Sequence, residues 1–237
     1  MVSLSTPEVG AAEGRPRARR LLEEHGLSLV LIALFLATLG GQMFSGLDAY
    51  NQELVEHGAR AVGFGAYLTS GHFIEATFEN WESEFLQMGM FVLLTVKLRQ
   101  RGSAESKEFG ESETDEDPRE HQHDPDAPWP VRRGGLVLTL YEHSLSIALF
   151  LLFAVAFVLH ALGGLSHVNA ENRLHGEPLE TLLGYVSGSQ FWYESFQNWQ
   201  SEFLSVLAMV VLTIFLRQRG SPQSKPVAAP HGETGGG

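Results

Sequence analysis

The sequence contains no cysteine, and this absence excludes disulfide bonds and cysteine-ligated metal centres. It also contains no phosphate-binding glycine loop, nucleophile elbow or zinc-protease helix motif, and no basic patch of the kind that binds nucleic acid. Composition and motifs therefore predict no cofactor, no catalytic residue set and no nucleic-acid partner. They favour a protein that is not an enzyme.

Long uncharged runs are what the sequence does contain. Residues 27–47 and 145–165 each comprise 21 residues without a charge. About 20 apolar residues are needed to cross the hydrocarbon core of a bilayer. Two shorter blocks, 81–98 and 199–216, begin at Trp81 and Trp199, which we interpret as interfacial anchors. The lipid bilayer is thus the first predicted partner, and we expect four transmembrane helices.

Two halves of the chain resemble each other. A shift of 118 residues aligns 24–107 with 142–225 without a gap, and 33 of the 84 pairs are identical. The strongest match is F-x-N-W-x-S-E-F-L at 78–86 and 196–204. Polar residues in register are not explained by apolar composition, so the sequence indicates a tandem duplication.

The duplication defines the expected organisation, an all-α membrane protein made of two tandem parallel helical hairpins. The predicted parts are a basic tail (1–22), hairpin repeat 1 (23–107), a disordered acidic linker (108–134), hairpin repeat 2 (135–225) and a disordered tail (226–237).

The orientation follows from lysine and arginine, because only Arg60 and Arg173 of the 16 lie in the two hairpin loops. The positive-inside rule then places both termini and the linker in the cytosol. Ser70-Gly71 is predicted to begin a helix over 71–98, whereas Gly58 and Gly176 are predicted to end the outgoing helices.

The repeated F-x-N-W-x-S-E-F-L block and the tail L-R-Q-R-G-S-x-x-S-K resemble an uncharacterised family of bacterial membrane proteins, a domain of unknown function. The resemblance covers about 24–107 and 142–225. It implies a multi-pass protein of the inner (plasma) membrane and supplies no reaction.

A polar cluster near the outer ends of the spans is the first candidate site. Glu84 and Glu202 each lie three residues inside a tryptophan, and intramembrane acids are functional hypotheses by default. Further polar residues are expected at similar depths in the membrane. The candidate cluster is therefore Glu84, Glu202, Asn80, Asn198, Gln42 and His160. The alternative is structural, with these side chains satisfying backbone groups near the headgroups.

A second candidate cluster lies in the outer loops, where a glutamate and a histidine are four residues apart in both copies: Glu53, His57, Glu171 and His175. This spacing can chelate a divalent metal, but it is also common for surface pairs, and histidine before a terminal glycine favours the helix dipole.

Three hypotheses for the function follow. The first is a non-catalytic scaffold or accessory membrane component, as a homo-oligomer or within a larger membrane complex. The second is proton or cation conduction through the Glu/His/Asn cluster near the outer leaflet. The third is a metal-dependent membrane enzyme that uses the outer-loop cluster.

Overall fold

The computed structural model describes residues 17–110 and 113–235, and these residues form helices and loops without a strand. The predicted all-helical class is therefore confirmed. The long helices are α1 (Arg17–Glu56), α3 (Gly71–Lys97), α6 (Ser144–His175) and α8 (Ser189–Phe215). The short elements are α2 (Phe64–Tyr67), η1 (Glu113–Asp115), η2 (Pro118–His121), α4 (Trp129–Arg133), α5 (Gly135–Glu142) and α7 (Leu182–Ser187).

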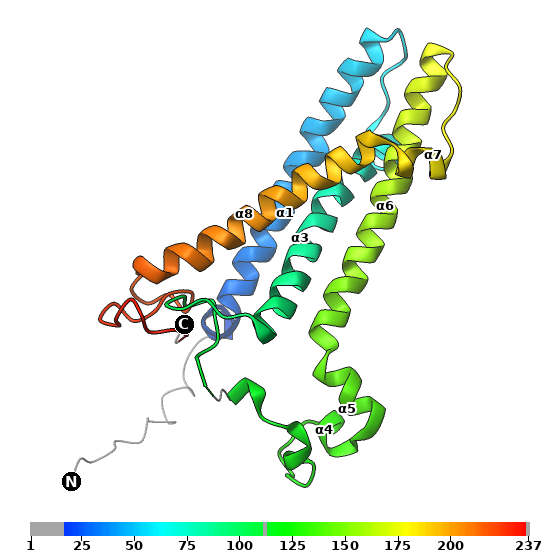
Figure 1. Ribbon diagram of the computed structural model, residues 1–237. Coiled ribbons are helices and arrows are strands. Elements are labelled where there is room, and N and C mark those ends of the chain that lie inside the picture. The colour runs from blue at the N-terminus through cyan, green and yellow to red at the C-terminus, as the bar shows by residue number, and fades with distance from the viewer. Residues whose placement is uncertain (1–16, 111–112, 236–237) are drawn as a thin grey trace, which may run out of the picture. The chain divides into compact units, whose positions relative to one another are not determined.

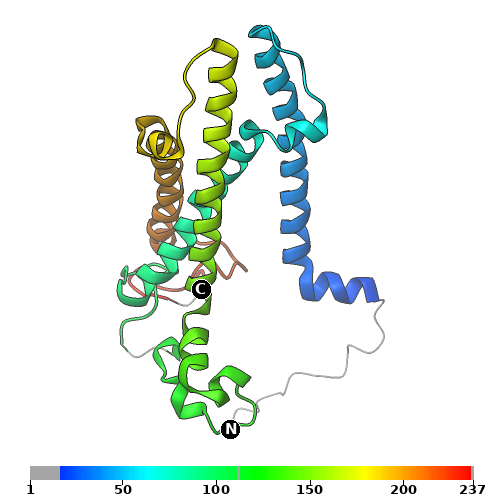
Figure 2. The same cartoon turned by 90° about the vertical axis from the view of Figure 1, so that its right-hand side faces the viewer.

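The chain forms two compact units, Met1–Phe64 and Gly65–Gly237. The first contains α1, which bends near its N-terminal end (Figure 2). This helix stops two residues before Gly58, whose φ of 74° is the left-handed conformation that the predicted stop requires. The loop that follows is held by Asn51, whose side chain donates to the Val62 carbonyl (3.1 Å) and accepts from the Val62 amide (2.7 Å).

In the second unit, α3 packs along α6 and also contacts α8 (Figure 1). Ser70 caps α3 by accepting a hydrogen bond from the Phe73 amide, which confirms the predicted start of this helix. The close approach of α3 to α6 depends on glycine. A Cβ on Gly163 would lie 2.6 Å from the Glu75 amide nitrogen, and one on Gly71 would lie 2.3 Å from that of His167.

The end of α6 is built like the end of α1. Gly176 follows the last residue of α6 with a φ of 71°, as predicted. Asn169 exchanges the same two hydrogen bonds with the backbone of Glu180, at 3.1 and 2.7 Å. The helices α3 and α8 also match, because each has 27 residues and their first residues are 118 positions apart.

The segment predicted as an acidic linker contains η1, η2 and α4, and α4 and α5 fold together at the end of α6 that is far from α7 (Figures 1 and 2). A small apolar core joins Ala127, Val131 and Leu138 there. In the predicted C-terminal tail, Thr234 accepts a hydrogen bond from the Gly102 amide at 2.9 Å.

In the part of the chain that the structure describes, three helices are long and apolar enough to cross a membrane: Leu21–Glu56 of α1, Ser144–His175 and Ser189–Phe215. They correspond to three of the four expected spans. The fourth, over 81–98, lies in α3, which is not among them and carries Glu79, Glu82 and Glu84. The structure thus supports a membrane protein at the level of helix length and composition.

Candidate functional site

A cavity of about 380 Å³ opens between α3, α6 and the start of α8, entirely within the second unit. Its ionisable lining consists of two histidines and four glutamates: His72, His167, Glu75, Glu79, Glu171 and Glu194. No lysine or arginine lines it. The cavity is therefore an acidic site formed by three long helices.

The helical periods explain why these residues meet. On α3, His72, Glu75, Glu79 and Glu82 follow a spacing of three, four and three residues, which places them on one face. On α8, Gln190, Glu194 and Asn198 are four residues apart and share a face in the same way. Each helix thus turns one polar stripe toward its neighbours.

His160 and Glu82 form the buried end of the site. Both side chains are 0% exposed, and His160 Nδ1 lies 2.9 Å from Glu82 Oε2. The second carboxylate oxygen of Glu82 accepts a hydrogen bond from the indole of Trp199 at 3.1 Å. A buried carboxylate is tolerated only when it is paired and hydrogen-bonded, and Glu82 meets both conditions.

Glu75 and Glu194 lie nearer to solvent, with side chains 13% and 20% exposed. The Tyr185 hydroxyl of α7 connects them, because its single hydrogen is shared between Glu75 Oε1 at 3.1 Å and Glu194 Oε2 at 3.5 Å. Burial, followed by the charge of Glu75, raises the pKa of the Tyr185 phenol, which keeps the hydroxyl protonated and donating.

Two further side chains orient these carboxylates. His167 Nδ1 lies 2.5 Å from Glu75 Oε2, and the Gln190 amide donates to Glu194 Oε1 at 2.6 Å. Asn198 donates to Glu79 Oε1. The acids are therefore held by neutral donors and histidine, which fixes their geometry.

Aromatic side chains close the inner side of the site. Phe191 is 0% exposed and its ring centroid lies 4.9 Å from that of His160, at 30°. Phe157 packs edge-on against Phe191, and Trp192 donates its indole hydrogen to the Val186 carbonyl. This apolar wall keeps water from the His160–Glu82 pair.

The residues of the predicted polar cluster are placed in different surroundings. His160 lies in the site, with Glu82 as its partner. Glu84 is exposed on α3 and Glu202 is half-buried on α8, two helices that contact each other. Asn198 reaches the site through Glu79, whereas Asn80 donates to the Ala76 carbonyl of its own helix.

Gln42 is half-buried on α1, in the first unit. Trp81 packs edge-on against Phe78, and its centroid lies 5.1 Å away. Trp199, expected as an interfacial anchor, is also the hydrogen-bond donor to Glu82. Trp199 therefore also stabilises the buried His160–Glu82 pair.

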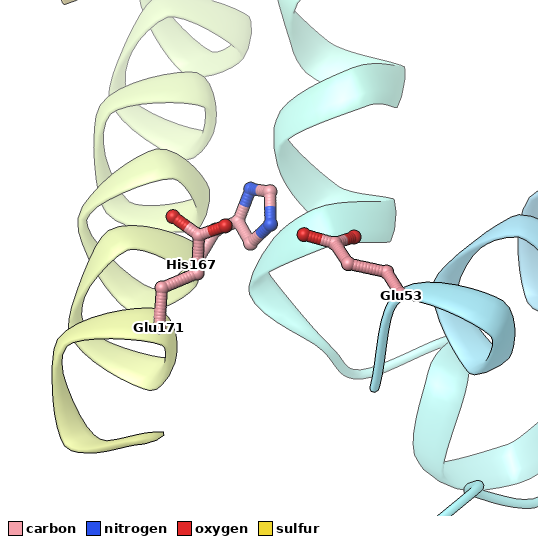
Figure 3. Close-up of side chains that lie close together, drawn as sticks. All are labelled: Glu53, His167 and Glu171. Carbon is pink, nitrogen blue, oxygen red and sulfur yellow. The ribbon is translucent and has the colours of Figure 1, made fainter. Parts of the chain in front are cut away.

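The outer-loop residues are spread over two helices. Glu171 lines the cavity and lies on the same side of α6 as His167, one turn away (Figure 3). His175 ends α6, exposed to solvent, and Glu53 lies in the last turn of α1. His57 Nδ1 lies 2.9 Å from the Glu53 carbonyl oxygen, a contact local to the helix end.

Sequence reasoning did not select several residues of the site: Glu79, Glu82, Glu194, His167 and Tyr185. It gave most weight to polar residues that occur in both copies. The spacing of histidine and glutamates along 72–82 was the signal that could have found the α3 stripe.

The chain matches the family model described as Domain of unknown function (DUF6766) over residues 18–236, and it belongs to this family. No curated protein and no solved structure matches the chain.

Proposed function

We propose that this protein is a four-span bacterial inner-membrane protein that binds a cation in the cavity between α3, α6 and α8. The observation that carries this proposal is the lining of the cavity, with four carboxylates, two histidines and no lysine or arginine. Such a surface attracts positive charge and repels anions. Of the three hypotheses, the one that involves a cation is therefore supported best by this lining. The residues concerned are not Glu84 and Glu202.

The proposal of a fourth span rests on the length of α3 and on the burial of Glu82. A helix of 27 residues is about 40 Å long, which suffices to cross the bilayer. Glu82 is fully buried and the Glu75 side chain is 13% exposed, and both face other helices of the chain. Acids that face protein rather than lipid are the form in which charges occur inside membranes.

The proposed duplication is supported by the matching bounds of α3 and α8 and by the equivalent Asn51 and Asn169 contacts. Each hairpin has an even number of spans, so both hairpins enter the membrane from the same side. Both termini and the linker are then cytosolic, and the cavity belongs to the outer side of the membrane.

The topology can be tested directly because the chain contains no cysteine. Single substitutions Ala59→Cys, Glu177→Cys and Glu120→Cys report on the first loop, the second loop and the linker. In intact cells or spheroplasts, a membrane-impermeant maleimide should label the two loop positions and leave Glu120→Cys unlabelled until the membrane is opened. If α3 did not cross, the linker would lie outside and the second loop inside, so labelling of Glu120→Cys with protection of Glu177→Cys in intact cells would refute the fourth span.

Cation binding is tested on the full chain in detergent after treatment with a chelator. Titration calorimetry with Mg²⁺, Ca²⁺, Mn²⁺ and Zn²⁺ should show one saturable site for at least one of these ions. Glu79→Gln, which introduces the residue present at the equivalent position 197, should weaken binding, while Glu177→Gln in the exposed loop should not. Absence of saturable heat for every ion refutes the proposed function.

The second candidate is the accessory membrane component. It is favoured by the exposure of Tyr193 (64%) and Phe196 (57%) on α8. Its partner would be another copy of the chain or a subunit of a membrane complex. Under this hypothesis, Tyr193→Ala and Phe196→Ala reduce the mass of the native assembly extracted in mild detergent, whereas Glu79→Gln leaves that mass unchanged.

A further inference from the structure

Two glutamates that line the cavity and the buried His160 beside them are arranged for coordination. Glu75, His160 and Glu194 each offer one ligand atom, and these atoms all lie within 4.8 Å of one another. They come from α3, α6 and α8, so the three helices converge on one point. A metal ion at this point would join them.

The buried imidazole supplies an independent observation. His160 is 0% exposed, and its Nε2 atom has no hydrogen-bond partner among the described residues. The nearest carboxylate oxygen, Oε2 of Glu194, is 3.7 Å away, too far for a hydrogen bond. A buried polar atom without a partner requires an explanation, and an ion between these two atoms provides one.

The other ring nitrogen explains why Nε2 is a ligand. His160 Nδ1 lies 2.9 Å from Glu82, so Nδ1 carries the proton and donates it to this carboxylate. In the neutral imidazole the Nε2 atom then holds a lone pair, and Oε2 of Glu194 lies 3.7 Å from it. A carboxylate that orients a metal-binding histidine in this way is a common feature of metal sites.

Outer hydrogen bonds also fix the two carboxylate ligands. Tyr185 shares its hydroxyl hydrogen between Glu75 and Glu194, and Gln190 donates to the second oxygen of Glu194. Each carboxylate oxygen retains a further lone pair for an ion. These side chains hold the ligands within about 5 Å of one another without closing the cavity.

We propose that Glu75, Glu194 and Nε2 of His160 bind one divalent first-row transition metal ion, with Glu82 and Trp199 as the supporting shell of the histidine. This inference rests on the proposed function and specifies its ligand. Imidazole nitrogen suits zinc, copper, iron and nickel, whereas magnesium and calcium prefer oxygen ligands.

The repeat supplies the substitutions for the test, because each residue has a non-ligating counterpart at the equivalent position. The variants His160→Gln, Glu194→Ala and Glu82→Gln introduce the residues found at positions 42, 76 and 200. The control is His175→Gln at the exposed end of α6. All are made in the full chain and compared for folding by size-exclusion chromatography and circular dichroism.

The experiment is a Co²⁺ titration followed by visible absorption. The wild-type chain and His175→Gln should develop ligand-field bands that saturate at one ion per chain. His160→Gln should lose these bands, and Glu82→Gln should weaken binding by about 10- to 100-fold while leaving a nitrogen ligand. Glu194→Ala, whose side chain is partly exposed, provides the same test should His160→Gln fail to fold.

If folded His160→Gln and Glu194→Ala give the same Co²⁺ spectra as the wild-type chain, this inference is overturned. Calorimetric binding of Ca²⁺ or Mg²⁺ by the same proteins would still leave the proposed function in place. If the wild-type chain binds no cation at all, the proposed function itself fails. The two failures are therefore distinguished by which ions bind.

Discussion

Glu82 has an environment that is unusual for a carboxylate. A fully buried carboxylate loses several kcal/mol of hydration, and only specific partners offset that loss. Glu82 has two partners, His160 on one oxygen and Trp199 on the other. Both partners lie in the second half of the chain, so this single side chain ties α3 to α6 and α8.

The contribution of the indole donor can be measured. Trp199→Phe keeps an aromatic ring but removes the hydrogen bond to Glu82, leaving one buried oxygen without a donor. We expect a loss of about 1–3 kcal/mol in stability. Thermal unfolding in detergent should show a lower Tm for this variant and an unchanged Tm for Trp129→Phe, whose side chain is 61% exposed. Equal melting of both variants would contradict the assigned role.

A second residue-scale prediction concerns pH and lies outside the membrane segments. The hydrogen bond from His121 to Glu116, followed by the charge of this carboxylate, raises the pKa of His121 above its ordinary value. The pair is therefore fully formed below the ordinary pKa of histidine and is lost as pH rises through the raised value.

An NMR titration of the His121 ring in the full chain should show a midpoint above 6.5, and Glu116→Gln should lower it. Because the pair is exposed, global stability should hardly change. A midpoint unaffected by Glu116→Gln would mean that η2 does not hold this pair in solution.

Among the elements, α3 and α6 carry the tightest constraint, because they approach through glycine. The Gly163 position has no room for a methyl group, since the nearest atom is backbone and cannot rotate away. Gly164 differs, because its added Cβ would meet the ends of Tyr185 and Glu75, 2.0 Å from the hydroxyl. Gly163 therefore determines the distance between α3 and α6, and Gly164 leaves room for the Tyr185 and Glu75 side chains of the site.

Gly163→Ala should destabilise the protein by about 1–3 kcal/mol, because overpacking pushes α3 away from α6. Gly40→Ala on α1, where an added Cβ meets nothing within 4 Å, is the control and should be neutral or slightly stabilising. Chemical unfolding in mixed micelles gives both values. Equal stability of the two variants would argue against the α3–α6 contact.

The elements were largely predictable because their signals are local. Ser70 as a cap and Gly58 and Gly176 as stops act within one turn of their own helix, and all three occur where expected. The pairing of His160 was not predictable in this way. It depends on which face of α3 meets α6. Glu82 and Glu84 are only two residues apart in the sequence, but this spacing places them on different faces of the helix.

At the scale of the whole molecule, a bound ion should act as a stabiliser of the folded chain. A ligand that binds only the native state adds about 2.7 kcal/mol at a hundredfold excess over its Kd. Co²⁺ should therefore raise the Tm of the wild-type protein, and EDTA should reverse the shift. The same addition should leave the Tm of His160→Gln unchanged, and an equal rise in that variant would point to binding elsewhere.

The second unit combines α3, which precedes the linker, with α6 and α8, which follow it. The acids Glu75 and Glu82 come from one side of the linker, and the imidazole of His160 comes from the other. Severing the polypeptide within 108–134 would therefore leave each fragment with an incomplete set of ligands. Two identical fragments could not rebuild the pocket by pairing with themselves, whereas the unlike halves, expressed together, would restore it.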